Sequence, residues 1–463
     1  MRIAVTKPLF AWDCLDDGPE LKTIREFFAI TPDTQLLNYL QTRRGRGRDD
    51  YPITVLWGVC LLQPLLRHVH VESVLDELRR NPSLRRILGI DSAEQVPKKY
   101  NMSRFLKVLG SADVLPLLRE VFDTMIRRLG TAVKDLGVHT AGDATKLSAR
   151  RQRAAGDAGG LPQPTGGRKE YADEAGKVVK VVEWFGYKLH LLVDVKHEVV
   201  LAYVVSSANI GDNEMIEALL DQAQANLAEE EAQDNATDGD ADGAPGRIQT
   251  MAYDKAADDG KVHALLNDHG VAPVIQNRSL WKDELERMLP GHDGTSNVVY
   301  DEAGSLHCYD KVSDPPVRHA MAYIGHEPKR GTVKYRCPAC HQGWSCPSHD
   351  RCNAGKRYGK TVRVKCEIDL RRFPPIPRAT KTFERLYKGR TAVERVNGRF
   401  KIFWGADDGN VTGAERFHAH VAAVMVVHAG LATLLAASPR RDGTLGQTRL
   451  SPIAQALRRS AGL

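Results

Sequence analysis

Apolar residues recur at helical spacing in the first third of the chain. Residues 71–80, 83–88 and 102–109 each place apolar side chains on one helix face, with Pro82 and Pro97 between them. Basic residues gather on and between these segments: Arg43, Arg44, Arg46, Arg48, Arg79, Arg80, Arg85, Arg86, Lys98, Lys99, Arg104 and Lys107. Short helices with arginines at their ends are typical of a helix-turn-helix-like DNA reader, although ordinary packing with a solvated basic face fits nearly as well. We expect residues 1–132 to form a helical N-terminal DNA-binding domain.

The pattern then changes to strands. Alternating or continuous apolar runs predict strands at 138–143, 179–195, 199–205, 248–254 and 271–275, with helices at 215–227 and 260–269. This order predicts a mixed α/β layer that begins with a meander. We expect the first part of this core to occupy residues 133–278, with a basic, Gly- and Pro-rich loop at 150–167.

Residues 279–378 interrupt the alternation of helices and strands. They are loop-rich, with strand candidates at 298–300, 306–309, 335 and 361–367, and they end in the stiff connector Pro374-Pro375-Ile376-Pro377. We interpret them as an inserted β-rich domain. The second part of the core is expected at 379–440, followed by a C-terminal tail at 441–463.

Two stripes run along the predicted helix at 387–401. One is polar and comprises Tyr387, Arg390, Glu394, Asn397 and Lys401, spaced by three or four residues. The other is apolar and comprises Leu386, Val393, Val396 and Phe400. A helix that buries one face and presents a carboxylate among cations is suited to an anionic substrate. A solvated charged face is the alternative interpretation.

Composition is that of a globular protein, with 42% hydrophobic and 27% charged residues among 463. The net charge of +7 understates how basic most of the chain is, because residues 229–242 carry seven acids and no base. A basic surplus suits a phosphate-rich partner, but it also fits a protein that is merely soluble.

Targeting and membrane signals are weak. We find no signal peptide in the first twelve residues, and the eight cysteines in a chain of this length do not indicate a disulfide framework. The apolar run at 421–437 contains His428, Gly430 and Thr433 and is shorter than the ~20 residues that span a bilayer, so a buried helix is predicted. We expect a cytoplasmic protein with no membrane partner.

Three acids stand out by their positions. Asp143 and Asp254 end predicted strands, and Glu394 lies on the polar helix stripe. Taken singly, each is best explained as a surface carboxylate. Brought together, they would offer the hard oxygen ligands that Mg²⁺ prefers. Two such ions about 4 Å apart stabilise the attacking and leaving oxygens of an in-line phosphoryl transfer.

These residues carry a family resemblance. Gly142-Asp143-Ala144-Thr145-Lys146, Tyr253-Asp254-Lys255-Ala256-Ala257 and the series Tyr387, Arg390, Glu394, Lys401 resemble the bacterial insertion-sequence DDE transposases that carry the Y-R-E-K signature. Gly186-Tyr187-Lys188-Leu189-His190 is similar to the second core strand of that family. The likeness spans about residues 138–437, and a weaker one covers 75–109.

The resemblance implies an RNase H-like fold and a division of labour among these residues. Asp143, Asp254 and Glu394 would be catalytic and bind Mg²⁺ or Mn²⁺, while the DNA-binding residues would be Tyr387, Arg390, Asn397, Lys401 and Lys146. The expected substrates are double-stranded DNA at the element ends and at the target. The expected assembly on DNA is a homodimer, located at the nucleoid of a bacterial cytoplasm.

The match is least good after the second aspartate. The family usually has an aromatic residue where this chain has Ala257, and Asp258 and Asp259 are close enough to be rival ligands. Those two would fall at a helix N-terminus, where Asp is commonly a cap, so we favour Asp254.

A cysteine cluster in the insertion is a separate signal. Cys337, Cys340, Cys346 and Cys352 lie in Gly- and Pro-rich sequence, with Cys308 and Cys366 as additional candidates. Thiolates at CxxC spacing favour tetrahedral Zn²⁺, which would staple this loop-rich region. The second pair has a wider spacing than usual, and four free thiols are the alternative.

The expected fold class is therefore α/β: an RNase H-like mixed sheet core with a helical N-terminal domain and a β-rich insertion, stapled by zinc if the cluster binds it. The expected activity is cutting at insertion-sequence ends and joining them to target DNA by two-metal phosphoryl transfer. Two alternatives stay open: a domesticated, catalytically inactive DNA-binding protein, and an RNase H-like nuclease that does not join strands.

Overall fold

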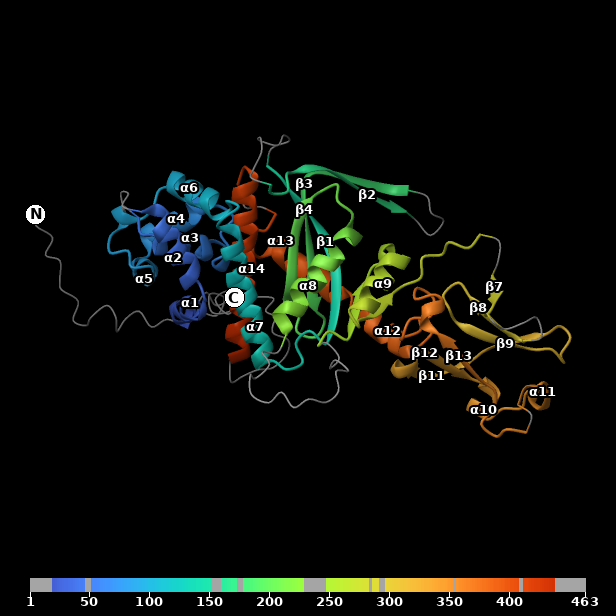
Figure 1. Cartoon of the computed structure of the whole chain (residues 1–463). Coiled ribbons are helices and arrows are strands. Elements are labelled where there is room, and N and C mark those ends of the chain that lie inside the picture. The colour runs from blue at the N-terminus through green and yellow to red at the C-terminus, as the bar shows by residue number, and fades with distance from the viewer. Residues whose placement is uncertain are drawn as a thin grey trace, which may run out of the picture. The chain divides into compact units, whose positions relative to one another are not determined.

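The computed structural model describes residues 19–45, 51–150, 160–172, 178–228, 247–282, 285–290, 296–353, 355–407 and 411–437 (Figure 1). The acidic segment 229–242 and the predicted tail 441–463 lie outside the described residues. The chain forms two compact units. The first comprises Met1–Gly137, Ala144–Glu231 and Ala392–Leu463, and the second comprises Val138–Asp143 and Ala232–Thr391.

The N-terminal part of the first unit is helical, as expected. Its helices are α1 (Pro19–Ile30), α2 (Thr34–Arg44), α3 (Ile53–Leu65), α4 (Val71–Arg80), α5 (Pro82–Ile87), α6 (Lys99–Leu109) and α7 (Leu115–Ala132). The three helices predicted from the apolar pattern are confirmed as α4, α5 and α6. Asn81 and Pro82 start α5, because the Asn81 side chain accepts a hydrogen bond from the Leu84 N–H at 3.1 Å.

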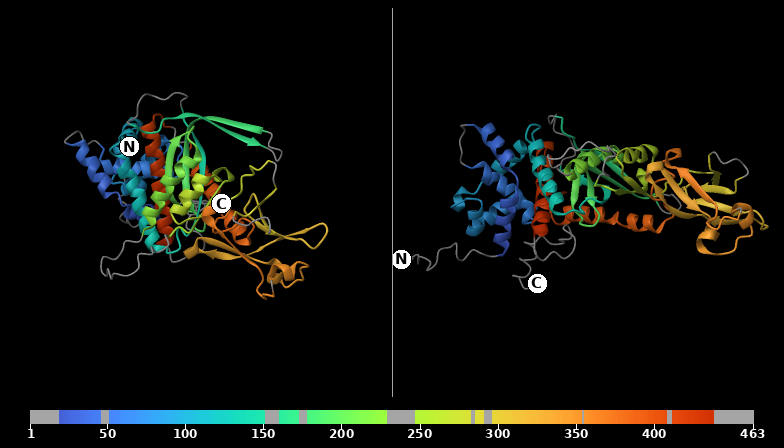
Figure 2. Two further views of the ribbon diagram at one scale, coloured as in Figure 1. Left: turned by 45° about the vertical axis from the view of Figure 1, so that its right-hand side comes forward. Right: turned by 60° about the horizontal axis from the view of Figure 1, so that its bottom comes forward.

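Helix α14 (Ala414–Ala437) is the centre of the first unit. It packs against α1, α3, α6, α7 and the strand β4, and it is buried almost continuously from Phe417 to Ala432. Figures 1 and 2 show it beside α7. By length and mean hydropathy (1.9) it is a candidate membrane span, but 78% of the apolar window is buried inside the protein. The interpretation of 421–437 as a buried helix is confirmed, with an earlier start at Ala414.

The strands of the first unit are β2 (Thr165–Ala172), β3 (Val178–Asp194) and β4 (Val200–Ser207), with helix α8 (Ile216–Leu227) packed on β4. Strand β3 is long enough to have different partners along one edge: its outer part pairs with β2 from Val178 to Gly186, and its inner part pairs with β4 from Tyr187 to Val193. It also neighbours β1 in the sheet. The outer part forms a two-stranded ribbon with β2 (Figures 1 and 2). Strand β2 begins inside the predicted loop at 150–167. That prediction was wrong at residues 165–167, because pairing with β3 orders a segment whose glycines give no strand signal of their own.

The second unit contains the parallel part of the core. Strand β1 (His139–Ser148) takes part in both units, and in this one it pairs in parallel with β5 (Thr250–Tyr253), which pairs in parallel with β6 (Ala272–Ile275). Helix α9 (Gly260–Asp268) connects β5 to β6. The hydrogen-bonded order is β2-β3-β1-β5-β6, with β4 on β3. A mixed sheet in which the antiparallel pair β3–β4 precedes the parallel strands β5 and β6 is consistent with the expected RNase H-like fold.

The insertion in the second unit is β-rich, as predicted. One sheet has the order β10-β9-β8-β7, formed by Val317–Ala320, Leu306–Asp310, Val298–Asp301 and Glu286–Met288; the other has the order β11-β12-β13, formed by Ala322–Glu327, Thr332–Arg336 and Thr361–Lys365. Both sheets contribute to one apolar cluster that includes Val298, Leu306, Val333, Tyr335 and Phe373. Two short helices, α10 (Pro338–Gln342) and α11 (His349–Asn353), carry the cysteine-rich segment.

Candidate active site

Asp143 and Asp254 lie at neighbouring positions of the parallel strand pair. The register of β1 with β5 runs from His139 opposite Thr250 to Ala141 opposite Ala252. Continued by two residues, it brings Asp143 opposite Asp254, whose backbone is still extended. Adjacent strands are about 4.8 Å apart, and directly opposite residues point to the same face. By this register, the two acids that the sequence singled out follow facing positions of the same strand pair.

The structure corrects the position of Asp143 along its strand. The sequence predicted a strand that ends at Asp143, but β1 continues to Ser148. Asp143 marks the point where the pairing with β5 ends and where the chain passes from the second unit to the first. The apolar pattern stops at Asp143 because the following residues Ala144, Thr145 and Lys146 are not fully buried, although they remain extended.

Asp254 is exposed directly after β5. Its Oδ1 accepts a hydrogen bond from the Lys255 N–H at 2.6 Å, which caps the short 3₁₀ helix Lys255–Ala257. Ala257, the residue that departs from the family pattern, is fully buried. The side chain of Asp254 is thus accessible, and its direction is fixed by its own backbone.

The two rival aspartates are occupied by other tasks. The Asp259 side chain caps α9 by accepting from the Val262 N–H at 2.9 Å, as the sequence suggested. Asp258 is not a cap: its buried carboxylate accepts from Arg371 Nε at 2.9 Å and from Arg378 Nη2 at 2.7 Å. Burial alone would raise the pKa of Asp258, but the hydrogen bonds from His263 and from these arginines hold it well below its usual range.

The arginine partners of Asp258 come from the connector at the end of the insertion, and sequence reasoning missed them. Arg378 also donates to the backbone oxygens of Ile275, Ala303 and Arg371. One guanidinium therefore joins the last core strand to the insertion. The only signal in the sequence was the presence of arginines beside the proline-rich connector. Asp258 is a structural acid, which leaves Asp254 as the accessible one.

The predicted helix at 387–401 is two helices. Helix α12 (Lys381–Lys388) ends at Lys388 with Gly389 as its C-cap, and α13 (Thr391–Ile402) begins two residues after Gly389. The Thr391 hydroxyl donates to the Lys388 carbonyl at 3.1 Å, which satisfies one of the open carbonyls at the end of α12. A single polar stripe from Tyr387 to Lys401 is therefore wrong, because Gly389 interrupts the helix before Arg390.

The two ends of the series have different surroundings. In the second unit, the Tyr387 ring stacks on Phe383 with ring centroids 5.8 Å apart, and the Arg390 guanidinium lies 5.8 Å from the Tyr387 ring centroid. In the first unit, Glu394 is exposed on α13, and Lys401 Nζ lies 4.0 Å from Asp407 Oδ2. Asn397 is buried, so it offers little surface to DNA. Lys146 is exposed on β1.

The apolar stripe is confirmed on α13. Val393, Val396 and Phe400 are fully buried, and the Phe400 ring contacts Trp404 and His428 at centroid distances of 5.2 Å. Leu386, on α12, is only partly buried. The interruption at Gly389 separates it from the other three.

The motif around Gly186 serves the packing of the core. A Cβ at Gly186 would lie 2.1 Å from the Leu147 carbonyl oxygen, so glycine permits close approach of β1 and β3. The Tyr187 ring stacks on Phe417 of α14, with centroids 4.2 Å apart. Lys188 Nζ donates to Asp212 Oδ1 at 2.8 Å.

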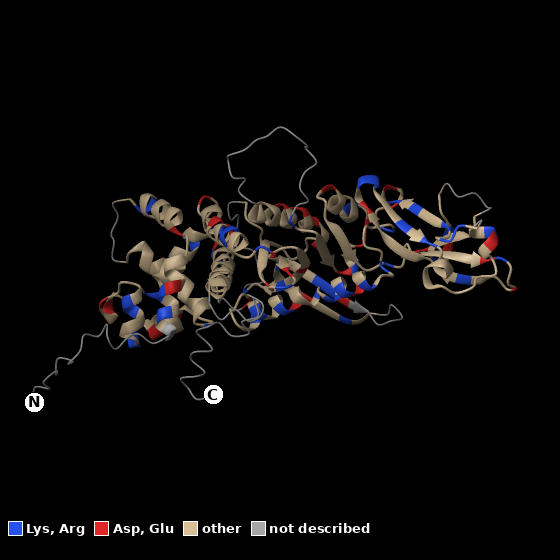
Figure 3. Ribbon diagram, turned by 90° about the horizontal axis from the view of Figure 1, so that it is seen from below, with Lys and Arg blue, Asp and Glu red and all other residues tan. Residues whose placement is uncertain are grey.

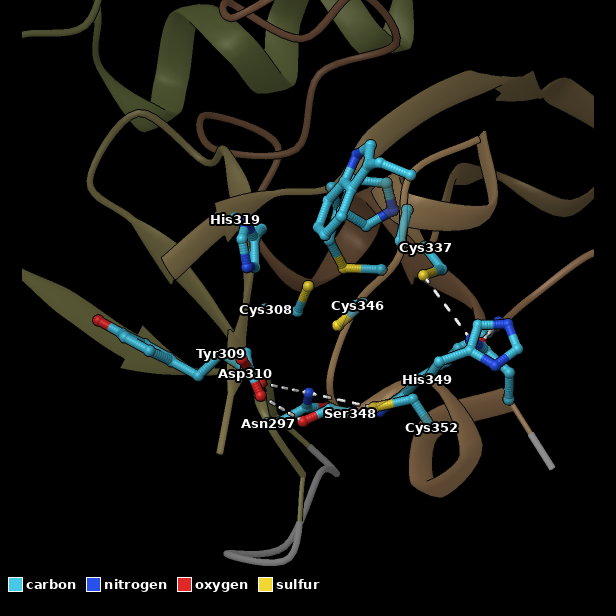
Figure 4. A pocket seen from close by; sticks show the side chains of 16 residues that line it. Asn297, Cys308, Tyr309, Asp310, His319, Cys337, Cys346, Ser348, His349 and Cys352 are labelled. Atoms are coloured by element: carbon cyan, nitrogen blue, oxygen red, sulfur yellow. Dashed lines mark hydrogen bonds between the residues drawn. The ribbon is translucent and has the colours of Figure 1, made fainter. Parts of the chain in front are cut away.

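The cysteines of the insertion gather around a small cavity. Cys308, Cys337, Cys346 and Cys352 line a space of about 20 Å³, room for roughly one water molecule (Figure 4). Asn297 donates to Cys352 Sγ at 3.5 Å, and Asn353 donates to Cys340 Sγ at 3.4 Å. Burial, with the neighbouring thiols Cys337, Cys352 and Cys346, raises the pKa of Cys308 to about 12.

The two additional zinc candidates differ in their surroundings. Cys308 belongs to the cavity, whereas Cys366 is part of the apolar core of the insertion. Within the part of the chain that the structure describes, no group of three or more His, Cys, Asp or Glu side chains has metal-binding geometry. The thiols are the ligand type that zinc prefers, but in the structure they do not stand in a tetrahedral arrangement.

Many basic residues of the helical region have acidic partners. Lys and Arg alternate with Asp and Glu over these helices (Figure 3). The ion pairs include Arg43–Asp113, Arg79–Asp76, Arg80–Glu77, Lys99–Glu72 and Lys107–Glu415. Such pairs favour ordinary packing with a solvated surface for these residues. Arg46 and Arg48 lie outside the described residues.

Comparison with known families agrees with the geometry. A family model described as Transposase DDE domain matches residues 135–429, which is more than half of the chain. A second one, described as Transposase domain (DUF772), matches residues 15–108. No curated protein matches the chain.

Proposed function

The chain belongs to the family of transposases with a DDE domain, and on that premise we propose that Asp143, Asp254 and Glu394 form its catalytic centre. Membership makes the chain a DNA transposase, an enzyme that cleaves and transfers DNA strands. The resemblance to insertion-sequence enzymes is confirmed at this level. The Y-R-E-K series and the roles of its residues stay predictions.

The observation that carries the proposal is the register of β1 and β5. Two carboxylates at facing positions of parallel strands repel each other, and a bound cation would relieve that repulsion. Asp258 and Asp259, the nearby alternatives, are committed to arginines and to a helix cap. We therefore favour Asp143 and Asp254 over these two as the acids that take part in the chemistry.

The donor set fits a hard divalent cation. The family typically uses divalent metal, and we propose Mg²⁺, with Mn²⁺ as a substitute, held by the carboxylates of Asp143, Asp254 and Glu394. When bound, such ions polarise the scissile phosphate and activate the attacking oxygen. We propose that water first cuts at the element end, and that the freed 3′-hydroxyl then attacks target DNA.

We assign DNA contacts to the cationic and aromatic residues of the series. Arg390 suits bidentate phosphate binding, and the Lys401 and Lys146 ammonium groups suit single phosphate contacts. The Tyr387 ring beside Arg390 would hold that guanidinium in place. Asn397 would need to leave its buried position to reach DNA, so we give it the weakest support.

We further propose that residues 1–132 bind the element ends and that the chain acts as a homodimer on them in the bacterial cytoplasm, at the nucleoid. The match of residues 15–108 to a transposase domain supports the first statement. A dimer follows from the need to bring two ends together.

The deciding experiment is cleavage of a duplex that carries the ends of the element encoding this chain, with Mg²⁺ as the metal. Asp143→Asn, Asp254→Asn and Glu394→Gln should each reduce cleavage by at least about 10³-fold while keeping the fold. Asp259→Asn is the matched control, since its side chain caps α9. Full cleavage activity of Asp254→Asn would contradict the assignment of Asp254 as a catalytic acid. Cleavage without strand joining would favour a nuclease, and an inert wild-type protein would favour the domesticated alternative.

We also propose that the insertion holds a structural zinc ion, with Cys337, Cys340, Cys346 and Cys352 as ligands. Three of these thiols line the cavity together with Cys308, and Cys340 lies on the short helix that follows Cys337. Asparagine N–H groups already donate to Cys340 and Cys352, which is how proteins stabilise metal-bound thiolates. The thiols would have to close in on the ion, since they do not yet stand in its coordination geometry.

Metal content of the purified full-length protein tests the zinc proposal. We expect about one zinc per chain, lost on Cys346→Ser, with a lower thermal midpoint. Cys366→Ser is the control, because Cys366 packs in the apolar core. Zinc-free wild-type protein with all thiols reactive would contradict it, and loss of zinc on Cys308→Ser but not on Cys340→Ser would exchange these two ligands.

A further inference from the structure

A buried carboxylate in the first unit lies outside the motifs that the proposed chemistry uses. Glu198 occupies the turn between β3 and β4, and its side chain is only 2% exposed. Its backbone has φ of +55°, in the left-handed region that disfavours a residue with a long side chain. A strained conformation at a buried charge persists only where the surroundings demand it.

The partners of Glu198 are two arginines of α13. Arg395 donates to Oε1 through Nε at 2.7 Å and through Nη2 at 2.6 Å. Arg399 donates to the other oxygen, Oε2. Each carboxylate oxygen thus takes one guanidinium, and the two arginines are one helical turn apart. Hydrogen bonds between charged groups are directional, so this pairing determines both the position and the rotation of the helix.

The turn that carries Glu198 is itself held firmly. The Asp194 carboxylate accepts from the N–H groups of His197 and Gly137, and the Glu198 N–H donates to the Asp194 carbonyl at 2.9 Å. One residue beyond Val199, the Val200 N–H donates to His428 Nε2 of α14 at 3.0 Å. The turn that carries Glu198, which we call the anchor, is therefore hydrogen-bonded to the sheet on one side and to the central helix α14 on the other.

The anchored helix also carries Glu394. The apolar face of α13, formed by Val393, Val396 and Phe400, determines which side of the helix is buried. Apolar packing alone tolerates a modest rotation of the helix about its axis. Glu394 precedes Arg395 by one residue, and therefore points about 100° away from it around the helix. Any rotation of Arg395 and Arg399 away from Glu198 turns the Glu394 carboxylate by the same angle.

We propose that Glu198 is a positioning residue for the catalytic centre: by pairing with Arg395 and Arg399 it sets the rotation of α13 and so the direction of the Glu394 carboxylate. This inference rests on the proposed role of Glu394. Glu198 acts through the two arginines.

The test is the Mg²⁺ dependence of end cleavage by full-length Glu198→Gln, at a temperature where all variants are folded. We expect the Mg²⁺ concentration for half-maximal cleavage to rise, and cleavage at low Mg²⁺ to fall, by about 10- to 100-fold. High Mg²⁺ should restore part of the rate. Metal-free binding of the end duplex should change much less than the Mg²⁺ dependence, because Tyr387, Arg390 and Lys146, among the proposed DNA contacts, do not lie on α13.

Two further variants keep the test decisive. Arg395→Gln removes only the half-exposed partner and should show a smaller shift of the same kind, so it serves if Glu198→Gln does not fold. Asp135→Asn is the matched control, because Asp135 pairs with Lys196 and His197 beside the same turn without touching α13. It should keep the wild-type Mg²⁺ dependence.

Each result has one meaning. If Glu198→Gln and Arg395→Gln lose activity only in proportion to unfolded protein, with unchanged Mg²⁺ dependence, the anchor is merely structural and the inference is overturned. If Glu394→Gln cleaves normally, the proposed catalytic centre fails instead. An inactive Glu394→Gln together with the shifted Mg²⁺ dependence of Glu198→Gln supports both.

Discussion

Gly142 leaves the space that the ring of Tyr253 fills. A Cβ at Gly142 would lie 2.3 Å from Tyr253 Cε2, far inside van der Waals contact. The two residues occupy the positions just before Asp143 and Asp254, where the β1–β5 register, continued by one residue, sets them opposite each other. Glycine opposite tyrosine on one face thus lets the two strands approach. The same approach brings the backbones of the two aspartates, which face the other side, to neighbouring positions.

Gly142→Ala should therefore damage both stability and cleavage. The added methyl meets the buried ring of Tyr253, so we expect the free energy of unfolding to fall by about 1–3 kcal/mol. Urea unfolding measures the change. Cleavage should fall further than the folded fraction, because the displaced strand carries Asp143.

Gly166→Ala is the control for this prediction, since a Cβ there has nothing within 4 Å and Gly166 is also in a strand. Its effect should stay within about 0.5 kcal/mol. Tyr253→Leu should relieve part of the Gly142→Ala penalty in the double variant, and strictly additive effects would show that the two residues do not compete for this space.

Asp258→Asn should destabilise the second unit without being a catalytic substitution. It leaves Arg371 and Arg378 buried without their shared charge, which costs about 3–5 kcal/mol when one partner of a buried ion pair is lost. Asp254→Asn, at an exposed position, should change stability by less than about 1 kcal/mol. Chemical denaturation of the two variants separates the structural acid from the accessible one. Equal stability of the two would contradict the assignment.

Lys401→Ala should weaken end binding on every sequence and reduce the slope of log K against log salt by about 1. The reason is the loss of one phosphate contact. Binding titrations between low and moderate salt provide the measurement. Lys196→Ala, which removes an ammonium paired with Asp135, should keep the wild-type slope. A Lys401→Ala slope equal to that of wild type would argue against phosphate contact.

Stability should fall between pH 6.5 and pH 4 because of buried neutral histidines. Burial, reinforced by Arg399, lowers the pKa of His428 from 6.5 to about 3, and burial lowers that of His418 to about 4. The unfolded chain takes up these protons as the pH drops below 6.5 while the folded chain does not, so protonation favours unfolding. Each such histidine should lower the free energy of unfolding by up to about 1.4 kcal/mol for each unit by which the pH falls.

His428→Gln tests the sign of this dependence. Glutamine keeps an acceptor for the Val200 N–H but does not titrate. Its free energy of unfolding should decline less steeply between pH 6.5 and pH 4 than that of wild type, measured by urea unfolding at a series of pH values. Parallel curves for the two proteins would exclude His428 as a contributor.

Gly398→Ala should stabilise the protein. Gly398 lies within α13, where a Cβ would have nothing within 4 Å. Alanine is favoured over glycine in a helix interior by about 1 kcal/mol, so thermal unfolding should shift upward. A decrease in the midpoint would show that this position needs the freedom of glycine.

Local patterns in the sequence were sufficient for many of the elements. Helices α4 to α6 follow from apolar spacing and from Asn81 with Pro82, because caps and periodicity act within one turn. The buried face of α13 follows for the same reason, because its apolar residues are close in the chain. The placement of Asp143 relative to Asp254 does not, because it depends on the register of two strands that are distant in the chain.

The interruption between α12 and α13 could be predicted from the sequence only in part. Gly389 weakens a helix, but the stripes on either side of it continue at helical spacing, and the pattern alone did not separate one bent helix from two. Strand β2 was hidden for a related reason, because its glycines become a strand only through the register with β3.

What the sequence by itself determined is the kind of protein and its candidate acids, since motif spacing and apolar periodicity are local properties. Only the tertiary structure decided which acid after β5 stays accessible. Asp254, Asp258 and Asp259 have similar sequence surroundings. In the folded chain their environments differ, because Arg371 and Arg378, more than a hundred residues further along the chain, neutralise Asp258. The same holds for Glu198 and α13: ion pairs between distant segments form only when the core brings them together, and no local pattern encodes them.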